Sequence, residues 1–478
     1  MSAAPAIEAL ELVLPETQLH VQGTNEFNKL NTSYLSALEG EITPAAILRP
    51  RTVEDVSTFL KTIKPFVTSG QTAFAIRGAG QQPLPGCANI QDGITLDLAL
   101  LTGVELDLDT GIVSIGAGER WGVVYEKLSN HGLGVTGSRS AKGGIGGLAL
   151  AGGLSFFSTR EGFICDNVVA YEVVLASGEV VKCSADANPD LYKSLRGGGN
   201  NFGIVVRYHM RTFEQGAFWG GSLFYHPPSF PNQVDALVQH LNGAHFETHI
   251  MISLFFAAQF GAVFGLNQVY YTRDVESPPV LDPFVKVQPQ LDQYNSVRRI
   301  NLCDAANEQA SMAADGIRVA YANTTVKADA ATLKAAAERF TASLDLVKGC
   351  KGVVFSLTFQ PYPVSLLEKC VSAGGNVTGL SPASGPLVSV LVLMNWVDKG
   401  DDKTMLGAAR SLLEAIDEDA AARDQAVPFK YLNYALDFQD PSGSYGAENK
   451  RLLQEVSKRY DPDGVFQQGV PGGFKLFA

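Results

Sequence analysis

The sequence predicts an α+β protein built from two domains, and two observations along the chain lead to this class. Between residues 74 and 213, short apolar runs alternate with glycine-marked turns, which predicts more strands than helices. After about residue 215, prolines cluster in HPPSFP, and helical patterns then alternate with apolar strand patterns, as expected for a second α+β domain. With 478 residues, of which 46% are hydrophobic, the chain is long enough to form both cores.

A strand followed by a helix is expected near the start of the first domain. Residues 45–64, AAILRPRTVEDVSTFLKTIK, begin with an apolar run that ends at a proline and continue with a helical pattern from about Thr52. Two acidic residues suit the first turn of that helix, because carboxylates stabilise its N-terminal end. Hairpin turns are predicted at residues 107–111 and 177–178, and a helix is predicted from about residue 121 to 130.

The stretch AFAIRGAGQQPLPG, residues 73–86, is expected to form a short strand and then a loop. Gly78 and Gly80 start a dinucleotide fingerprint of the form G-x-G-x-x-G, but the third glycine is missing and Pro83 opposes a helix. A relaxed form of the fingerprint occurs at residues 144–149, where the preceding TGSRSAK is polar and does not resemble a strand. Neither match therefore predicts a Rossmann-type site.

The second domain is expected to combine antiparallel strands with long helices. Strands are predicted in IMISLFFAAQFGAVFGLNQVYY and GVVFSLTFQ, and helices in NQVDALVQHLN and at about residues 328–346 and 402–421. The predicted limits are 1–215 for the first domain, with a core at about 40–215, 216–430 for the second domain, and 431–478 for a C-terminal segment that returns to the first.

Charge and composition argue against several classes of function. The net charge of −12 provides no basic surface for nucleic acid or for an anionic membrane. No apolar run approaches the length of a membrane helix, and the N-terminus lacks the basic start of a signal peptide. The six cysteines and seven histidines show no metal-ligand spacing, so no metal site is predicted. We expect a soluble cytoplasmic protein, either a monomer or a small homo-oligomer.

Five stretches carry the residues that indicate chemistry. Glycines at the density found in the first four let backbone N–H groups approach a diphosphate closely without any lysine. The expected ligand therefore carries phosphate and is gripped by several loops. The stretches are AIRGAGQ (75–81), GSRSAKGGIGGLALAGG (137–153), GFICDNVVAYEVVLASGE (162–179), SLRGGGNNFGIVV (194–206) and YLNYALDFQD (431–440).

The order of these five stretches resembles the vanillyl-alcohol oxidase type, or PCMH type, of FAD-binding proteins. Within that type it resembles the berberine-bridge-enzyme-like oxidases of plant and fungal secondary metabolism. The resemblance covers nearly the whole chain and implies a two-domain PCMH-type FAD-binding fold. It also implies a substrate domain built on an antiparallel sheet flanked by helices, and an FAD-dependent oxidoreductase that acts on a small molecule.

Neither residue that tethers the flavin in that family is present. Gln81 stands where the family motif R-[SG]-G-G-H has its histidine, and Ser140 stands where a second loop often has a cysteine. FAD is therefore expected to bind noncovalently. The resemblance implies that the cofactor is held by Arg77, Gly78, Ala79, Gly80, Gln81, Ser138, Ser140, Gly143, Gly144, Gly146, Gly147, Asp166, Asn167, Gly203, Val205 and Asn433.

The YLNYALD stretch raises the question of a catalytic base. As a strand it would place Tyr431 and Asn433 on one face and Leu432 and Tyr434 on the other. The resemblance implies that Asn433 lies close to the flavin and that Tyr434 takes a proton from a substrate hydroxyl while hydride moves to flavin N5. A tyrosine with a pKa of about 10 is a poor base at neutral pH, so we expect a neighbouring donor or cation. The alternative is a half-buried strand tyrosine without a catalytic role.

Three polar or aromatic residues at the ends of apolar strands, Gln360, Asn395 and Trp396, are implied by the resemblance to form the floor of the substrate pocket. Edge positions in a sheet would explain them equally well. Asp166 and Asn167 match a D-N motif that shapes the fold around the cofactor. A glycine at position 143 is expected to leave room for oxygen, which favours an oxidase.

Three functions therefore remain open at the level of sequence. The first is an oxidase of secondary metabolism that takes hydride from an alcohol or C–H group of a neutral, largely apolar small molecule and is reoxidised by oxygen. The second is a flavin-fold isomerase or cyclase without net redox chemistry. The third is a noncatalytic apo binding protein.

Overall fold

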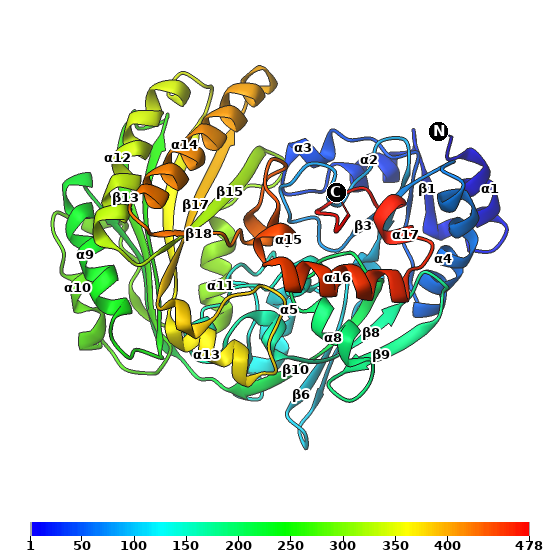
Figure 1. The fold of residues 1–478 in the computed structure, drawn as a ribbon, viewed down its shortest axis with the longest axis horizontal. Coiled ribbons are helices and arrows are strands. Elements are labelled where there is room, and N and C mark those ends of the chain that lie inside the picture. Colours follow the sequence, from blue (N-terminus) through cyan, green and yellow to red (C-terminus); the bar gives the residue numbers. More distant parts are fainter. Residues whose placement is uncertain (1, 478) are drawn as a thin grey trace.

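Three β-sheets divide the chain into two parts in the computed structural model, which describes residues 2–477 (Figure 1). The first part contains a four-stranded sheet of order β1-β2-β4-β3 and a six-stranded sheet of order β5-β6-β10-β8-β9, with β7 paired to β10. Its strands are β1 (Leu19–Val21), β2 (Ala46–Leu48), β3 (Phe74–Arg77), β4 (Ile94–Asp97), β5 (Val104–Asp107), β6 (Ile112–Gly116), β7 (Leu133–Val135), β8 (Val168–Val174), β9 (Val180–Ser184) and β10 (Ile204–Glu214).

The second part contains an eight-stranded sheet in which every neighbouring pair of strands is antiparallel. This sheet confirms the predicted α+β fold with an antiparallel sheet in its second half. The predicted limit near residue 215 falls in the connection between β10 and β11. In spatial order the strands are β14 (Arg298–Ile300), β11 (Phe218–Tyr225), β13 (Ala262–Tyr271), β12 (Thr248–Ala257), β16 (Val354–Tyr362), β17 (Leu387–Trp396), β15 (Arg318–Lys327) and β18 (Ala426–Val427).

Helices of the first part pack beside its two sheets, and the C-terminal helices return to them (Figure 1). The predicted helix start at Thr52 is confirmed, because the Thr52 hydroxyl accepts from the Asp55 N–H and the Asp55 carboxylate accepts from the Thr52 N–H. The helices are α1 (Ala4–Glu11), α2 (Asn25–Asn31), α3 (Ala37–Gly40), α4 (Val53–Thr68), α5 (Trp121–Ser129), α6 (Ile145–Leu150), α7 (Ser158–Glu161), α8 (Pro189–Leu195), α15 (Pro441–Ser444), α16 (Ala447–Tyr460) and α17 (Val465–Gln468).

Long helices cover one face of the eight-stranded sheet, while the opposite face is turned toward the first part (Figure 1). Strand β17 shows the alternation clearly, because Val390, Val392 and Met394 are fully buried in the core beneath the helices. The intervening residues of β17 point to the other face. The helices of this part are α9 (Phe230–Leu241), α10 (Asp282–Val285), α11 (Leu302–Ser311), α12 (Ala330–Val347), α13 (Val364–Ser372) and α14 (Asp402–Ala422).

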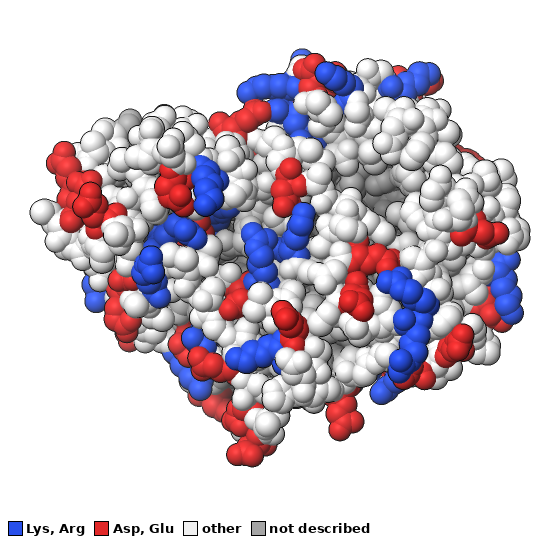
Figure 2. All heavy atoms as spheres, turned by 180° about the vertical axis from the view of Figure 1, so that it is seen from behind, with Lys and Arg blue, Asp and Glu red and all other residues white. Residues whose placement is uncertain are grey.

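The surface carries both signs of charge. Figure 2 shows acidic and basic side chains interspersed over the face opposite to that of Figure 1. None of the helices within residues 2–477 combines the length and the apolar character that crossing a membrane requires.

Candidate active site

A cavity of about 760 Å³ lies between the glycine-rich loops of the first part and the free face of the eight-stranded sheet. This volume is in the range of small-molecule and cofactor sites. The sheet lines it with every second residue of its central strands, as the two-residue period of a strand requires. These residues are Met251, Ser253 and Phe255 of β12, Val354, Ser356 and Thr358 of β16, and Leu391, Leu393 and Asn395 of β17.

The first part lines the cavity with most of the residues predicted to hold a cofactor. The loop after β3 and the loop before α6 approach each other there, and a Cβ built on Gly144 would lie only 2.4 Å from the Ala79 Cβ. The approach of the two loops therefore requires glycine at position 144. The lining residues among those predicted are Gly78, Ala79, Gly80, Gln81, Ser138, Ser140, Gly143, Gly144, Gly146, Gly147, Gly203, Val205 and Asn433.

This cradle fits an FAD molecule. A Cβ on Gly147 would meet no atom within 4 Å, so the backbone is open to a ligand at that position. Glycine-rich backbone with small polar neighbours is the donor set that suits a diphosphate. The cavity then continues onto the sheet, which gives an extended ligand further wall to contact.

Arg120 joins the two glycine-rich loops and was not predicted. Its Nη2 donates to the Ala79 carbonyl at 3.1 Å, and its Nη1 donates to the Lys142 carbonyl. Backbone pairing between Arg120 and Gly144 adds a further link. Because Arg120 is distant in sequence from Ala79 and lies outside the quoted glycine stretches, no spacing pattern marks it as part of the site.

Gly143 lines the cavity, as the sequence predicted. A Cβ at this position would lie 2.6 Å from the Ser138 Oγ, so it would point at a neighbouring loop. The expectation that a glycine at this position leaves room for oxygen stays a prediction.

Five residues predicted for the site do not line the cavity: Arg77, Asp166, Asn167, Gln360 and Trp396. Gln360, predicted as part of the pocket floor, lines a smaller pocket behind the cavity wall and reaches the site through Tyr434 and Arg139. Arg77 turns away and donates to the carbonyl groups of Leu30 and Ser33. Asp166 and Asn167 are buried and organise their own turn, where Asp166 accepts from the Phe163 N–H at 3.0 Å. Their contacts fit a role in shaping the fold.

Trp396 is also turned away from the cavity, which corrects the prediction that it forms the pocket floor. The alternation of β17 sends Asn395 to the cavity and Trp396 to the helix-covered face. There the Trp396 Nε1 donates to the Asp402 carboxylate at 2.7 Å.

The YLNYALD stretch is not a strand at its candidate catalytic residues. Leu432–Tyr434 form a 3-10 turn, and the Tyr434 N–H donates to the Tyr431 carbonyl at 3.0 Å. The predicted alternation is therefore wrong. The physical reason is Asn323, whose side-chain amide pairs with both the N–H and the carbonyl of Tyr431 and takes the place of a neighbouring strand. The turn brings the rings of Tyr431 and Tyr434 into edge-to-face contact, with their centroids 4.8 Å apart.

Asn433 ties this turn to the cofactor cradle. Its Nδ2 donates to the Ala151 carbonyl at 3.1 Å and to the Tyr431 Oη at 2.9 Å. Its carbonyl accepts from the Gln82 Nε2 at 3.3 Å. Asn433 therefore positions the C-terminal turn against the glycine-rich loops.

Tyr434 faces the cavity, where two donors reach its oxygen. The Arg139 Nη2 donates to the Tyr434 Oη at 2.7 Å. In the amide orientation that satisfies its neighbours, Gln360 donates from Nε2 to the Tyr434 Oη at 3.2 Å and accepts from Arg139 Nη1 at 3.0 Å. Arg139 thus supplies the neighbouring cation that the sequence required. It stands inside the quoted stretch GSRSAKGG, but nothing in the spacing distinguishes it from Lys142.

Other tyrosines beside Tyr434 are held in the neutral form. Burial, then the nearby Tyr434, raises the pKa of Tyr321 to about 12, and the same causes raise the pKa of Tyr431 well above its usual range. Neither receives the guanidinium that Tyr434 receives. The hydrogen bond from the Arg139 guanidinium therefore distinguishes Tyr434 from these neighbouring tyrosines.

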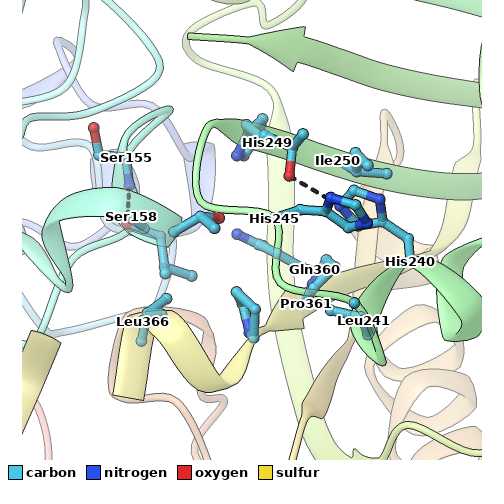
Figure 3. Close-up of a pocket in the computed structure, with 15 residues that line it drawn as sticks. Ser155, Ser158, His240, Leu241, His245, His249, Ile250, Gln360, Pro361 and Leu366 are labelled. Atoms are coloured by element: carbon cyan, nitrogen blue, oxygen red, sulfur yellow. Dashed lines mark hydrogen bonds between the residues drawn. The ribbon is translucent and has the colours of Figure 1, made fainter. Parts of the chain in front are cut away.

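A small pocket of about 30 Å³ lies on the other side of Gln360 (Figure 3). The His240 Nε2 shares a hydrogen bond with the Thr248 hydroxyl at 2.9 Å. The His240 ring stacks on the His245 ring, with the two ring centroids 4.4 Å apart. Burial, then His245, lowers the pKa of His240 to about 4, and burial, then Arg139, lowers the pKa of His249 well below its usual range. His240 and His249 are therefore neutral near pH 7 and place no cation behind Gln360.

Comparison with known proteins agrees with this site. The FAD binding domain family matches residues 44–184. The chain is 38% identical over 448 residues to the FAD-dependent monooxygenase tpcD of Cochliobolus heterostrophus, covering 91% of this chain and 85% of that protein. It is 35% identical over 461 residues to the FAD-dependent monooxygenase FUP4 of Fusarium proliferatum, covering 93% of this chain and 87% of that protein.

Solved structures show the same fold at lower identity. 6-Hydroxy-D-nicotine oxidase from Arthrobacter nicotinovorans aligns with a TM-score of 0.77 at 20% identity, over 94% of this chain and 96% of that one. A variant of berberine bridge enzyme in complex with (S)-reticuline aligns with a TM-score of 0.78 at 15% identity, over 99% of this chain and 100% of that one. These likenesses confirm the predicted two-domain fold.

Proposed function

Because this chain belongs to the family of FAD-linked oxidoreductases that includes tpcD and FUP4, we propose that it oxidises a small molecule in the cavity with Tyr434 as its base. The contact between Arg139 Nη2 and Tyr434 Oη, at 2.7 Å, is the observation that carries this proposal. A guanidinium that donates to a phenol oxygen stabilises the negative charge left when the phenol gives up its proton.

Once Tyr434 has given up its own proton to solvent, its Oη takes the proton of a substrate hydroxyl. Arg139 and Gln360 hold that oxygen from two sides, so the base is fixed in place before substrate enters. FAD, when bound, supplies the two-electron acceptor that this oxidation needs. The glycine-rich loops would hold its diphosphate, with Asn433 and Gln82 joining them to the catalytic turn.

We further propose that FAD is held without a covalent bond. Gln81 and Ser140 line the cavity where relatives of the resembled type carry histidine and cysteine, and neither side chain offers a comparable nucleophile. Cys87 also lines the cavity, but burial, then the charge of Glu39, raises the pKa of its thiol to about 12. The thiolate that a covalent attachment requires is therefore scarce at neutral pH.

A second candidate function is the insertion of oxygen into the substrate, because both relatives are named monooxygenases. The two reactions differ in where oxygen atoms end. An oxidase returns both atoms of O₂ as hydrogen peroxide. A monooxygenase places one atom in the product and one in water, and it takes the two further electrons and protons that this requires from a reductant such as NADPH, which the assay below includes. In either case we expect a role in secondary metabolism, with a substrate that is largely apolar in keeping with the cavity wall.

Turnover in oxygen gas enriched in the heavy isotope separates these candidates. Peroxide equal to the product formed, with no label in the product, supports the oxidase. One labelled atom per product supports the monooxygenase. Product formed without oxygen consumption would contradict both and indicate an isomerase or cyclase, and a chain that binds no FAD would contradict the proposal as a whole.

A further inference from the structure

One end of the large cavity is walled by aromatic side chains of the eight-stranded sheet. Phe255 of β12 and Phe224 of β11 line the cavity there. On β13, which runs between these two strands, Phe264 pairs directly with Phe255, and their ring centroids lie 5.8 Å apart. Phe224 pairs with Leu266, two residues further along β13 and therefore on the same face. Three neighbouring strands thus place aromatic rings at this aromatic end of the cavity.

Ring contacts continue from the aromatic end to the surface of the molecule. Phe260, in the turn between β12 and β13, contacts Phe264 edge to face with the centroids 5.4 Å apart, and it is 57% exposed. Tyr294 contacts Phe224 in the same way at 5.8 Å and is 58% exposed. Single exposed aromatic residues are normal, but both of these are joined through ring contacts to the wall of a cavity. The aromatic end therefore extends to solvent.

The charged side chain of the cavity lies away from the aromatic end. Among the described residues, 2–477, that line the cavity, Arg139 is the one charged side chain. It contacts Met251 of β12, which lies four residues before Phe255 on the same face of the sheet. At about 3.3 Å per residue, these two positions are about 13 Å apart along the strand. A ligand that touches both regions is therefore elongated.

The sheet between the two regions offers a ligand few hydrogen bonds. The hydroxyl groups of Ser253 and Thr358 bond to each other at 2.9 Å, and the Ser356 Oγ donates to the Leu393 carbonyl at 3.1 Å. Only one of the three hydroxyl hydrogens is left for a ligand. Asn395 adds a polar group beyond them, but its amide carries no charge. This wall suits an uncharged ligand with a largely apolar surface.

We propose that the aromatic end is a distal subsite of the substrate pocket, in which Phe255 and Phe224 bind a ring of the substrate remote from its reacting hydroxyl. The substrate is accordingly an elongated, uncharged molecule with an aromatic ring at the end opposite to that hydroxyl. Phe255 determines specificity, because an aromatic pair is more favourable than its buried area alone. The inference rests on the proposed function, since it assigns a second region to the substrate of the same site.

Two isomeric alcohols test the distal subsite. In 4-biphenylmethanol the second ring continues the line of the first, whereas in 2-biphenylmethanol the same ring is folded back beside the hydroxymethyl group. Both isomers are titrated by calorimetry into the flavin-loaded full-length enzyme. The linear isomer is expected to bind about threefold to tenfold more tightly, the effect of one aromatic pair. Phe255→Ala should remove this preference and leave binding of the folded isomer within about twofold.

Two further variants keep the test decisive. Phe246→Ala is the matched control, because Phe246 is an exposed phenylalanine that does not line the cavity, and this variant should keep the preference. Phe255→Leu retains an apolar side chain in β12 and provides the test if Phe255→Ala does not fold. It should reduce the preference to less than about twofold. Equal binding of the two isomers to the unmodified enzyme, or a preference that survives the replacement of Phe255, would overturn the distal subsite.

Failure of the distal subsite and failure of the proposed function give different results, because the titration measures binding alone. If the preference depends on Phe255 while Tyr434→Phe turns over normally, the base in the proposed function is wrong and the distal subsite stands. If Tyr434→Phe loses turnover while the two isomers bind equally, the base stands and the distal subsite is overturned.

Discussion

The Arg139 guanidinium donates to the Tyr434 Oη at 2.7 Å across a junction of three distant chain segments. Arg139 comes from a glycine-rich loop of the first part, Tyr434 from the C-terminal turn, and Gln360 from the sheet of the second part. Each segment alone is unremarkable in chemistry. Their meeting places a guanidinium and a side-chain amide on one phenol oxygen at the wall of the cavity.

Replacing Tyr434 with Phe tests the base directly. The ring and its packing remain while the oxygen is lost, so FAD content should be unchanged and turnover should fall by about a hundredfold or more. Tyr321→Phe is the matched control, because Tyr321 also lines the cavity but receives no guanidinium. Comparable turnover of Tyr434→Phe and the unmodified enzyme, with flavin retained in both, would show that Tyr434 is not the base.

Gly144→Ala should reduce FAD binding. The added methyl would lie 2.4 Å from the Ala79 Cβ, so the two loops of the cradle would have to separate. We expect at least about a tenfold weaker FAD affinity, measured by fluorescence titration of the apoprotein. Gly407→Ala, in helix α14 with no atom within 4 Å of the added methyl, is the control and should bind FAD normally. Normal FAD affinity in Gly144→Ala would place the cofactor elsewhere.

Glu39 makes stability depend on pH beside the cavity. Its carboxylate is fully buried and accepts from the backbone N–H groups of Gly86 and Ala88, and burial raises its pKa from 4.5 to about 7. The folded state therefore binds more protons than the unfolded chain between pH 4.5 and about 7. The stabilising contribution of the protonated form is complete below pH 4.5 and is lost as pH rises through this window.

Denaturant unfolding of the wild type and Glu39→Gln at several pH values measures this contribution. Across the window the wild type should lose up to about 1.4 kcal/mol per pH unit relative to the variant. Other titrating groups affect both proteins alike and cancel in the difference. Parallel stability curves for the two proteins would show that Glu39 titrates as an ordinary exposed carboxyl group.

The sequence alone was sufficient to predict the elements whose structure depends on residues close together in the chain. The helix that begins after Thr52 is capped by the Thr52 side chain and by Asp55, three residues later. The alternation of β17 is likewise a local pattern, and it shows that Asn395 and Trp396 lie on opposite faces of the sheet. It does not show which of the two faces the cavity. A polar residue at a strand end does not reveal which face is covered by helices.

The parts that sequence could not predict depend on contacts between distant residues. The turn at Leu432–Tyr434 replaces the expected strand because Asn323, more than a hundred positions earlier, binds the backbone of Tyr431. Arg139 could not be recognised for the same reason, since its partners come from three other segments. The glycine-rich loops were predictable because a diphosphate is bound by backbone N–H groups, which any suitable run of glycines can provide.

The most direct test of the account is the fate of the flavin when the purified protein is precipitated with acid. The account predicts a protein that contains FAD and releases it into the supernatant, because Gln81 and Ser140 replace the usual attachment residues and Cys87 is held as a thiol. Flavin that stays in the pellet would contradict the noncovalent cradle and reveal an attachment residue. A protein that takes up no FAD even when it is added would contradict the central claim that this cavity is a flavin site.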